Sequence, residues 1–367
     1  MGLLRILLAL AVLFSHVEGS GIKMLMGGLC VYVFFVISGF YMALILTQRY
    51  DAKAHLKMFY LNRFLRIYPT YWFVLALAIC YYCVCNYITS GKTPEPVLFA
   101  ISLHVNIWQT AAMWFANITL FGHDLMHCFH WSPVSGFSFL AYQATNHPSG
   151  VFWLGDATWI SPAWSLGVEV VFYCMVPFIY DKSKAFLVSF AGVSIFSFWY
   201  LNQYTVGGAY FVGFSSIWMF VLGIFGFRFY QWAKPLFQKI TCKPLQAFVY
   251  SSPIAWVVLF PSIFKSDLNL VVVILVGALS VPLLFFISER SSIDRLIGNL
   301  SYPLYISHEL VSGAVASATH RFQIGVRTQA WLEIVASIIF ASFLYFLFDR
   351  CFEQLRSRNV SQAVKPA

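Results

Sequence analysis

The sequence has very few charged residues, and this shortage excludes most soluble architectures. Only 10% of its 367 residues are Asp, Glu, Lys or Arg, whereas 60% are hydrophobic. A soluble globular domain has about 25% charged residues. The sequence also has no internal repeat, no low-complexity linker and no series of short alternating segments that would indicate a transmembrane β-barrel. Repeated apolar runs instead predict an all-α integral membrane protein.

Ten apolar stretches predict about ten transmembrane helices. The predicted spans are 3–16, 27–47, 68–88, 164–180, 185–201, 211–230, 247–263, 269–288, 297–318 and 329–349. Segment 97–121 is also apolar, but a crossing there would invert the side of every later loop. We therefore place 97–163 on the outer side, with 97–121 re-entrant or in the interface. We interpret 1–352 as one membrane domain and 353–367 as a short cytoplasmic tail.

The basic residues are divided unevenly between the two sides of this predicted topology. The outer segments hold 5 of the 23 Lys and Arg residues, and the cytoplasmic segments and helix ends hold the other 18. Cytoplasmic loops of membrane proteins carry such an excess. The distribution therefore predicts cytoplasmic N- and C-termini in a multi-pass protein of the inner (plasma) membrane. It also explains the net charge of +9 without nucleic acid.

The first predicted helix carries two ionisable residues, Arg5 and His16, within an apolar sequence. They are eleven residues apart, which places them within ~20° of one helix face and ~16 Å apart along the axis. Ionisable groups within a membrane normally face a protein interior or a wet cavity. The alternative is a cleaved signal peptide. Glu18 and His16 argue against it, because a cleavage site prefers small neutral residues.

The loop 48–67 ends with two arginines three residues apart, Arg63 and Arg66, and Pro69 predicts the start of the next helix. On a helix the two arginines share a face. Their forked donors suit phosphate groups. The positive-inside rule alone is the alternative explanation.

The second predicted span contains the small residues Ser38 and Gly39 near its middle. A small-residue pair lets another helix backbone approach closely. The simplest partner is the helix that carries Arg5 and His16. Ordinary helix packing is the alternative.

A carboxylate follows the aromatic outer region. Glu169 lies five residues beyond Trp164, at a depth similar to that of His16. A carboxylate beside an imidazole orients the ring and raises its basicity. We therefore predict that Glu169 pairs with His16. An ion pair that only fixes helix register is the alternative.

The segment GNLSYPLYISHEL carries a polar stripe into the predicted span 297–318. Ser301, Tyr305 and His308 have the spacing i, i+4 and i+7 and share a helix face. Tyr302 lies beside them. Interhelical hydrogen bonding is the alternative function of this stripe.

The outer region 97–163 contains four closely spaced ligand-type residues, His123, Asp124, His127 and His130. Neutral imidazole is the commonest metal ligand. No cysteine or further carboxylate completes a recognised metal pattern, so solvated loop histidines are the favoured interpretation. The tryptophans of this region suit either the membrane interface or platforms for sugar rings.

Five stretches together resemble one family. They are Arg5 and His16 with ten residues between them, GGLCVYVFFVISGF from Gly27, FYLNRFLRIYPTYW from Phe59, WSLGVEVVFY from Trp164 and SYPLYISH from Ser301. In this order they resemble acyltransferase family 3, whose members are membrane-bound O-acyltransferases. One departure is the sequence Cys-Val-Tyr at 30–32, where family members often carry Gly-Val-Asp. It removes a carboxylate.

The resemblance implies ten membrane helices, acetyl-CoA as the usual acyl donor and an essential pair of Arg5 and His16. It implies that the acceptor is an extracytoplasmic hydroxyl, such as one on an exopolysaccharide, an O-antigen or a lipid-linked glycan. Expected partners are acyl-CoA, the carbohydrate acceptor, membrane lipids and the polysaccharide biosynthesis machinery of the cell envelope. No nucleic acid, no metal and no permanently bound cofactor is expected.

On this hypothesis the donor is held at the cytoplasmic side. Arg63 and Arg66 would bind the phosphates of CoA, and Arg5 would meet the pantetheine end or the thioester carbonyl. The other residues expected near the donor are Ser38, Ser301 and Tyr302.

The acceptor hydroxyl would be activated by His16. Its imidazole, oriented by Glu169, would act either as a general base or as a transient acyl carrier. The residues expected to contact the acceptor are Trp164, Tyr305 and His308. A secondary transporter or flippase is the alternative function, because buried Arg, His and Glu also form proton relays. Such a transporter should show an inverted repeat, which this sequence lacks.

Overall fold

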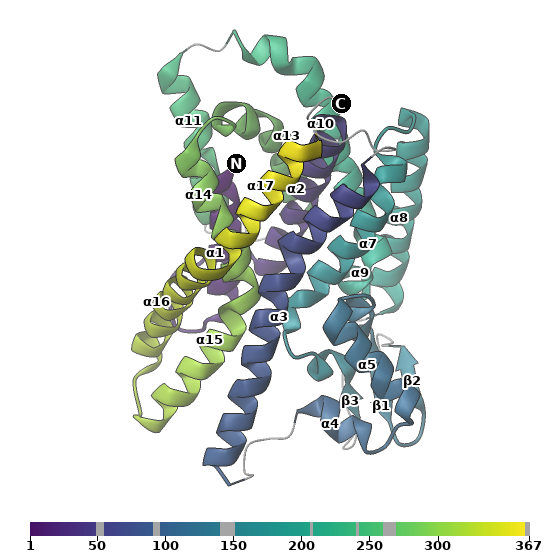
Figure 1. Cartoon of the computed structure of the whole chain (residues 1–367), viewed down its shortest axis with the longest axis vertical. Helices are drawn as coiled ribbons and strands as arrows, with labels where there is room; N and C mark the ends of the chain where they lie inside the picture. Colours follow the sequence, from purple (N-terminus) through teal and green to yellow (C-terminus); the bar gives the residue numbers. More distant parts are fainter. Residues whose placement is uncertain are drawn as a thin grey trace. The chain divides into compact units, whose positions relative to one another are not determined.

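A computed structural model describes residues 1–48, 55–90, 96–139, 151–205, 208–239, 242–259 and 269–363 (Figure 1). The structure is 82% helical, which confirms the all-α class. Contacts divide the chain into two compact units. Unit 1 comprises Met1–Arg66, Val176–Asp181 and Met219–Ala367, and unit 2 comprises Ile67–Met175 and Lys182–Trp218.

Unit 1 is built around α1, a short apolar helix that packs against α2, α14 and α15. The α15 helix in turn runs along α16 (Figure 1). The helices of unit 1 are α1 (Gly2–His16), α2 (Gly27–Gln48), the start of α3 (Leu56–Ile88), most of α10 (Gly213–Phe237), α11 (Lys243–Ile254), the π-helical turn η3 (Ala255–Leu259), α13 (Asn269–Ser288), α14 (Ser292–Asn299), α15 (Ser301–Arg321), α16 (Val326–Leu344), the π-helical turn η4 (Tyr345–Asp349) and α17 (Arg350–Ala363).

The N-terminal end of α1 is held by Asp294 of α14. The Asp294 carboxylate accepts hydrogen bonds from the backbone N–H groups of Gly2 and Leu3, at 2.7 and 2.9 Å. The Tyr250 hydroxyl donates to the same carboxylate at 2.8 Å. The first N–H groups of a helix have no intrahelical partner, so this side chain caps α1 and fixes the start of the helix that carries Arg5 and His16.

Glycines set the close helix contacts of α2. A Cβ atom at Gly39 would collide with the backbone of Phe220 on α10, and one at Gly27 would collide with Ser15 of α1. The prediction that Gly39 faces the helix of Arg5 and His16 is therefore wrong. Gly39 serves the approach of α10, and α1 meets α2 nearer the start of α2, because Gly27 leaves space for Ser15.

Unit 2 contains the only sheet among the described residues, a small antiparallel one with strand order β2-β1-β3. Trp131 of β1 pairs with Phe137 of β2 and Phe152 of β3. The elements of unit 2 are the remainder of α3, α4 (Val97–Ser102), α5 (Ile107–Thr119), α6 (His123–Met126), β1 (Phe129–Ser132), β2 (Gly136–Phe139), β3 (Phe152–Trp153), the 3₁₀ turns η1 (Leu154–Ala157) and η2 (Ser161–Ala163), most of α7 (Trp164–Ile179), α8 (Lys184–Tyr204), α9 (Gly208–Phe211) and the start of α10.

The apolar segment 97–121 forms two short helices rather than one span. The α4 helix has 6 residues and α5 has 13, whereas a crossing needs about 20. Their apolar side chains, such as Leu98 and Met113, pack with Trp131 in the core of unit 2. The segment is therefore not a single transmembrane helix, and its location at the membrane interface stays a prediction.

Seven helices of the described chain are long and apolar enough to cross a membrane. They occupy 27–48, 56–88, 161–179, 184–204, 213–237, 270–288 and 326–357. The predicted count of ten and the cytoplasmic location of both termini stay predictions. Part of the predicted loop 48–67 lies outside the described residues. Its later part belongs to α3, which begins at Leu56. Pro69 therefore lies inside a helix. The prediction that Pro69 begins a helix is wrong.

Candidate functional site

Helices α1 and α15 bring His16, His308 and Glu309 together in unit 1. The rings of His16 and His308 have centroids 5.0 Å apart. The Nε2 atom of His16 lies 3.5 Å from Oε1 of Glu309. His308 is buried, whereas the side chains of His16 and Glu309 are 44% and 33% exposed. The cluster is therefore exposed on the side of His16.

Backbone carbonyls fix the proton positions of both imidazoles. The Nδ1 atom of His16 lies 2.9 Å from the carbonyl oxygen of Val12, and that of His308 lies 2.8 Å from the carbonyl oxygen of Tyr305. Because a carbonyl only accepts hydrogen bonds, we assign the proton of each neutral ring to Nδ1. Each Nε2 atom then carries a lone pair. That of His308 is buried and has no hydrogen-bond partner among the described residues.

This arrangement can hold one extra cation. The ligand atoms of His16, His308 and Glu309 lie within 4.8 Å of one another, the only such group of three among the described residues. Two lone pairs and a carboxylate can share a proton, in which case the His16 ring becomes an imidazolium beside Glu309. Two histidines and one carboxylate are also a known metal-ligand set. The cluster is thus suited to proton transfer at Nε2 of His16 or to a divalent metal.

The carboxylate that contacts His16 in unit 1 is not the one that the sequence indicated. Glu309 directly follows His308 in the sequence, and an acidic residue inside a predicted span was the signal that could have identified it. Glu169 lies on α7 in unit 2, where its side chain is half-buried. Its pairing with His16 stays a prediction.

A second cluster surrounds Arg66. Its Nη1 atom lies 3.4 Å from Oδ2 of buried Asp349, and its Cζ atom lies 5.5 Å from the ring centroid of Tyr302. Arg63 lies one turn earlier on α3, and its Nη1 atom is 3.9 Å from Sδ of Met42. The structure therefore brings Arg66 and Tyr302 together, and their role as donor contacts stays a prediction.

Two residues of this second cluster were not predicted. Asp349 is the last residue of the predicted span 329–349, and it forms an ion pair with Arg66. Arg356 on α17 lies within electrostatic range of Arg63, Arg66 and Asp349. Three guanidinium groups thus gather near one buried carboxylate, which favours an added anion.

The remaining predicted residues are distributed over both units. Tyr305 is buried, with its ring centroid 6.2 Å from that of His308. The Ser301 hydroxyl donates to the carbonyl oxygen of Gly298 at 2.6 Å at the start of α15.

Ser38 is buried within α2, and Arg5 is half-buried on α1. Trp164 is buried in unit 2, where its ring centroid lies 4.4 Å from that of Tyr210. It therefore belongs to an aromatic cluster of unit 2.

Two of the outer histidines, His123 and His127, are not solvated, so the favoured interpretation is wrong for them. His123 and His127 are buried in unit 2 with their ring centroids 5.9 Å apart. The ring of His127 stacks on that of Phe211 at 4.7 Å. Burial lowers the pKa of His123 to about 3, aided by His127, and burial lowers the pKa of His127 to about 4. Aromatic packing, which the spacing of the histidines did not reveal, removes them from water.

Comparison with protein families gives a match to a family described as an acyltransferase domain, over residues 1–350. Comparison with curated proteins and with solved structures gives no match. The family match includes every residue of the His16 cluster and both Arg63 and Arg66.

Proposed function

This chain belongs to acyltransferase family 3 and is a membrane acyltransferase, and we propose that it is an O-acetyltransferase. In this proposal the donor is cytoplasmic acetyl-CoA, or another acyl-CoA, and the acceptor is a hydroxyl of an extracytoplasmic carbohydrate. Exopolysaccharide, O-antigen and lipid-linked glycans have such hydroxyls. The protein would act in the inner membrane as part of cell-envelope polysaccharide biosynthesis. Membership in an acyltransferase family argues against the alternative of a transporter or flippase.

The proposal rests on the tautomer of His16 and on the exposure of its side chain. Its Nδ1 atom faces the carbonyl oxygen of Val12 at 2.9 Å, so Nε2 is the basic atom, and the side chain is 44% exposed. A general base must present a lone pair to a substrate hydroxyl. Nε2 of His16 meets this requirement, while Val12 holds the ring in the correct tautomer.

The proposed reaction moves one proton through this atom. As the acceptor oxygen attacks the thioester carbonyl carbon, Nε2 of His16 takes the hydroxyl proton. The C–S bond then breaks, and the leaving sulfur takes the proton from the imidazolium. The products are an ester and free CoA. General base catalysis of this kind contributes about 10²–10⁴-fold.

Glu309 supports the charged state of His16 in this sequence of steps. Its Oε1 atom lies 3.5 Å from Nε2, so its carboxylate stabilises the imidazolium that forms during the transfer. A covalent relay, in which Nε2 carries the acyl group, would use the same atom. It would differ by leaving an acyl-enzyme in the absence of acceptor.

The donor phosphates are assigned to Arg63 and Arg66. The support is their position on one face of α3 and the presence of Arg356 nearby. Arg5 lies on the same helix as His16, about three turns away, so the extended pantetheine arm would run along α1 between the two.

Transfer of label from donor to glycan tests the function. Membranes that contain the protein are incubated with radiolabelled acetyl-CoA and a panel of cell-surface glycans, next to membranes that contain the His16→Ala variant. We expect label on a glycan, released by mild base as an ester requires. Base-stable label would indicate transfer to an amine, and the absence of label from all glycans tested would count against a carbohydrate acceptor.

A further inference from the structure

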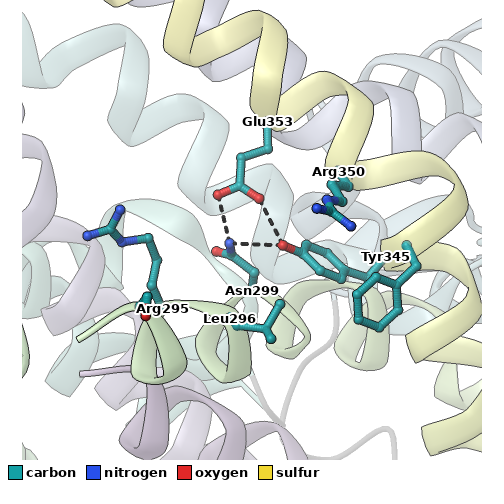
Figure 2. Close-up of a pocket in the computed structure, with 8 residues that line it drawn as sticks. Arg295, Leu296, Asn299, Tyr345, Arg350 and Glu353 are labelled. Atoms are coloured by element: carbon teal, nitrogen blue, oxygen red, sulfur yellow. Dashed lines mark hydrogen bonds between the residues drawn. The ribbon is translucent and has the colours of Figure 1, made fainter.

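A pocket of about 260 Å³ lies between α14, η4 and α17 in unit 1. Figure 2 shows Arg295 of α14 and Arg350 of α17 on opposite sides of a central group of polar side chains. The pocket is close to the smallest ligand sites of proteins, which begin at roughly 300 Å³. It therefore fits part of a ligand such as acyl-CoA but not the whole molecule.

The polar side chains at the centre of the pocket form hydrogen bonds with one another. Asn299 donates from Nδ2 to Oε1 of Glu353 at 2.8 Å, and the Tyr345 hydroxyl donates to Oε2 at 3.0 Å (Figure 2). Both oxygens of Glu353 thus already accept a hydrogen bond. The carboxylate is held as part of the pocket wall and is not paired with either arginine.

The two arginines are consequently available to a ligand. Arg295 and Arg350 are exposed, and neither forms an ion pair with a residue that the structure describes. Guanidinium groups present planar forks of N–H donors that match phosphate oxygens. Two arginines that line one pocket indicate a site for an anion with several oxygens.

The pocket adjoins the Arg66 cluster along the chain, because Arg350 directly follows Asp349, whose Oδ2 atom lies 3.4 Å from Nη1 of Arg66. Glu353 lines the pocket and also acts electrostatically on Arg356, which in turn experiences the charges of Arg63 and Arg66. All of these residues belong to unit 1. One ligand with two separate phosphate groups could therefore engage both the pocket and the Arg66 cluster.

We propose that the pocket of Arg295 and Arg350 binds a phosphate monoester, and that this group is the 3′-phosphate on the ribose of the acyl-CoA donor. Arg63 and Arg66 then hold the diphosphate of the same molecule. This inference rests on the proposed function, because it requires CoA as the donor. An anionic lipid headgroup offers the same phosphate chemistry and is the competing source.

The test uses a donor that lacks only the predicted ligand group. CoA and dephospho-CoA, which has no 3′-phosphate, are titrated calorimetrically into purified full-length protein. Arg295→Gln and Arg350→Gln should each weaken CoA binding at least about tenfold, as expected for a hydrogen bond to a charged group. Neither variant should change the binding of dephospho-CoA. Arg290→Gln is the matched control, because Arg290 is exposed and does not line the pocket.

Other results distinguish a failure of the 3′-phosphate assignment from a failure of the proposed function. Equal losses for CoA and dephospho-CoA, or no loss in either variant, would overturn the 3′-phosphate assignment and leave the proposed function intact. A wild-type protein that binds neither ligand would overturn both. Thermal melting of each variant without ligand should match the wild type, and Arg295→Lys and Arg350→Lys should partly restore the preference for CoA.

A further experiment tests whether the phosphate comes from a lipid headgroup. Thermal stability is measured in nanodiscs of zwitterionic lipid with and without an added lipid that carries a phosphate monoester headgroup. The proposal expects the same stabilisation, if any, for wild type, Arg350→Gln and Arg290→Gln. Stabilisation that Arg295→Gln and Arg350→Gln abolish, together with unchanged CoA binding, would assign the pocket to a lipid and overturn the proposal.

Discussion

The Nε2 atom of His16 faces Oε1 of Glu309 at 3.5 Å, from the end of α1 to the middle of α15. The opposite ring nitrogen is held by Val12 of its own helix. His16 therefore has one fixed proton and one reactive lone pair beside a carboxylate. This relationship makes Glu309, and not only Glu169, a residue on which turnover should depend.

Replacement of Glu309 by glutamine should slow transfer with little effect on donor binding. The variant keeps the size of the side chain but no longer stabilises an imidazolium at His16. Loss of a carboxylate that supports a histidine at metal sites costs about 10- to 100-fold, and we expect a fall of kcat in that range. Glu309→Asp should recover part of it. A normal kcat for Glu309→Gln alongside a reduced kcat for Glu169→Gln would return the orienting role to Glu169.

Removal of metal ions should leave the reaction intact, because the proposed mechanism uses only a proton at His16. Purified protein is dialysed against a chelator, its metal content is measured, and transfer is assayed before and after. We expect no more than a minor change in rate. Activity that disappears and returns with one divalent metal, but not in Glu309→Gln, would show that His16, His308 and Glu309 are metal ligands.

Arg66→Ala should weaken acyl-CoA binding by about 1.5–3 kcal/mol, the value of a hydrogen bond to a charged group. Lysine should restore only part of this loss, since it lacks the planar fork of arginine. Equilibrium binding to the purified variants provides the measurement, and Arg228→Ala is a control with a similar change of charge. Arg228 contacts the carbonyl oxygen of Tyr180 and lies on α10. Equal binding by Arg66→Ala and wild type would leave Arg66 with a structural role, through Asp349.

Acidification should destabilise unit 2 through His123 and His127. Their pKa values in the folded protein are lowered to about 3 and about 4, from 6.5 for the exposed group. Below pH about 6.5 the unfolded chain gains protons that the folded chain does not, so stability falls as the pH decreases toward about 4.

Thermal melting between pH 7.5 and about 5 measures this effect. His127→Phe should reduce the decrease in melting temperature, because phenylalanine can stack on Phe211 without titrating. Asp124 is present in both proteins, so the comparison isolates His127. The same pH dependence in the variant and the wild type would contradict the assignment.

The sequence predicted the main features of unit 1 because they depend on periodicity and on polar residues in apolar surroundings. The stripe of Arg5 and His16 and the polar face of α15 follow from helical spacing, and the structure brings His16 and His308 together. The contact between Arg66 and Tyr302 could be expected only because the predicted topology places both residues on the same side of the membrane. Periodicity identifies the face of a helix but not its neighbour.

Predictions of which helix or side chain packs against a given residue were less accurate. Gly39 was assigned to the wrong helix, because a small residue shows that a backbone approaches but not which one does. The burial of His123 and His127 was missed, because it results from aromatic residues distant in sequence, such as Phe211. Glu309 was overlooked although it adjoins His308 in the sequence.

In the proposed mechanism, Nε2 of His16 removes the proton of the acceptor hydroxyl. The most direct measurement compares donor binding and glycan acylation for purified His16→Ala and wild-type protein. We expect the variant to bind acyl-CoA with nearly the wild-type affinity and its rate of transfer to fall by about 10²–10⁴-fold or more. Acylation at the wild-type rate by His16→Ala would show that His16 is not the general base.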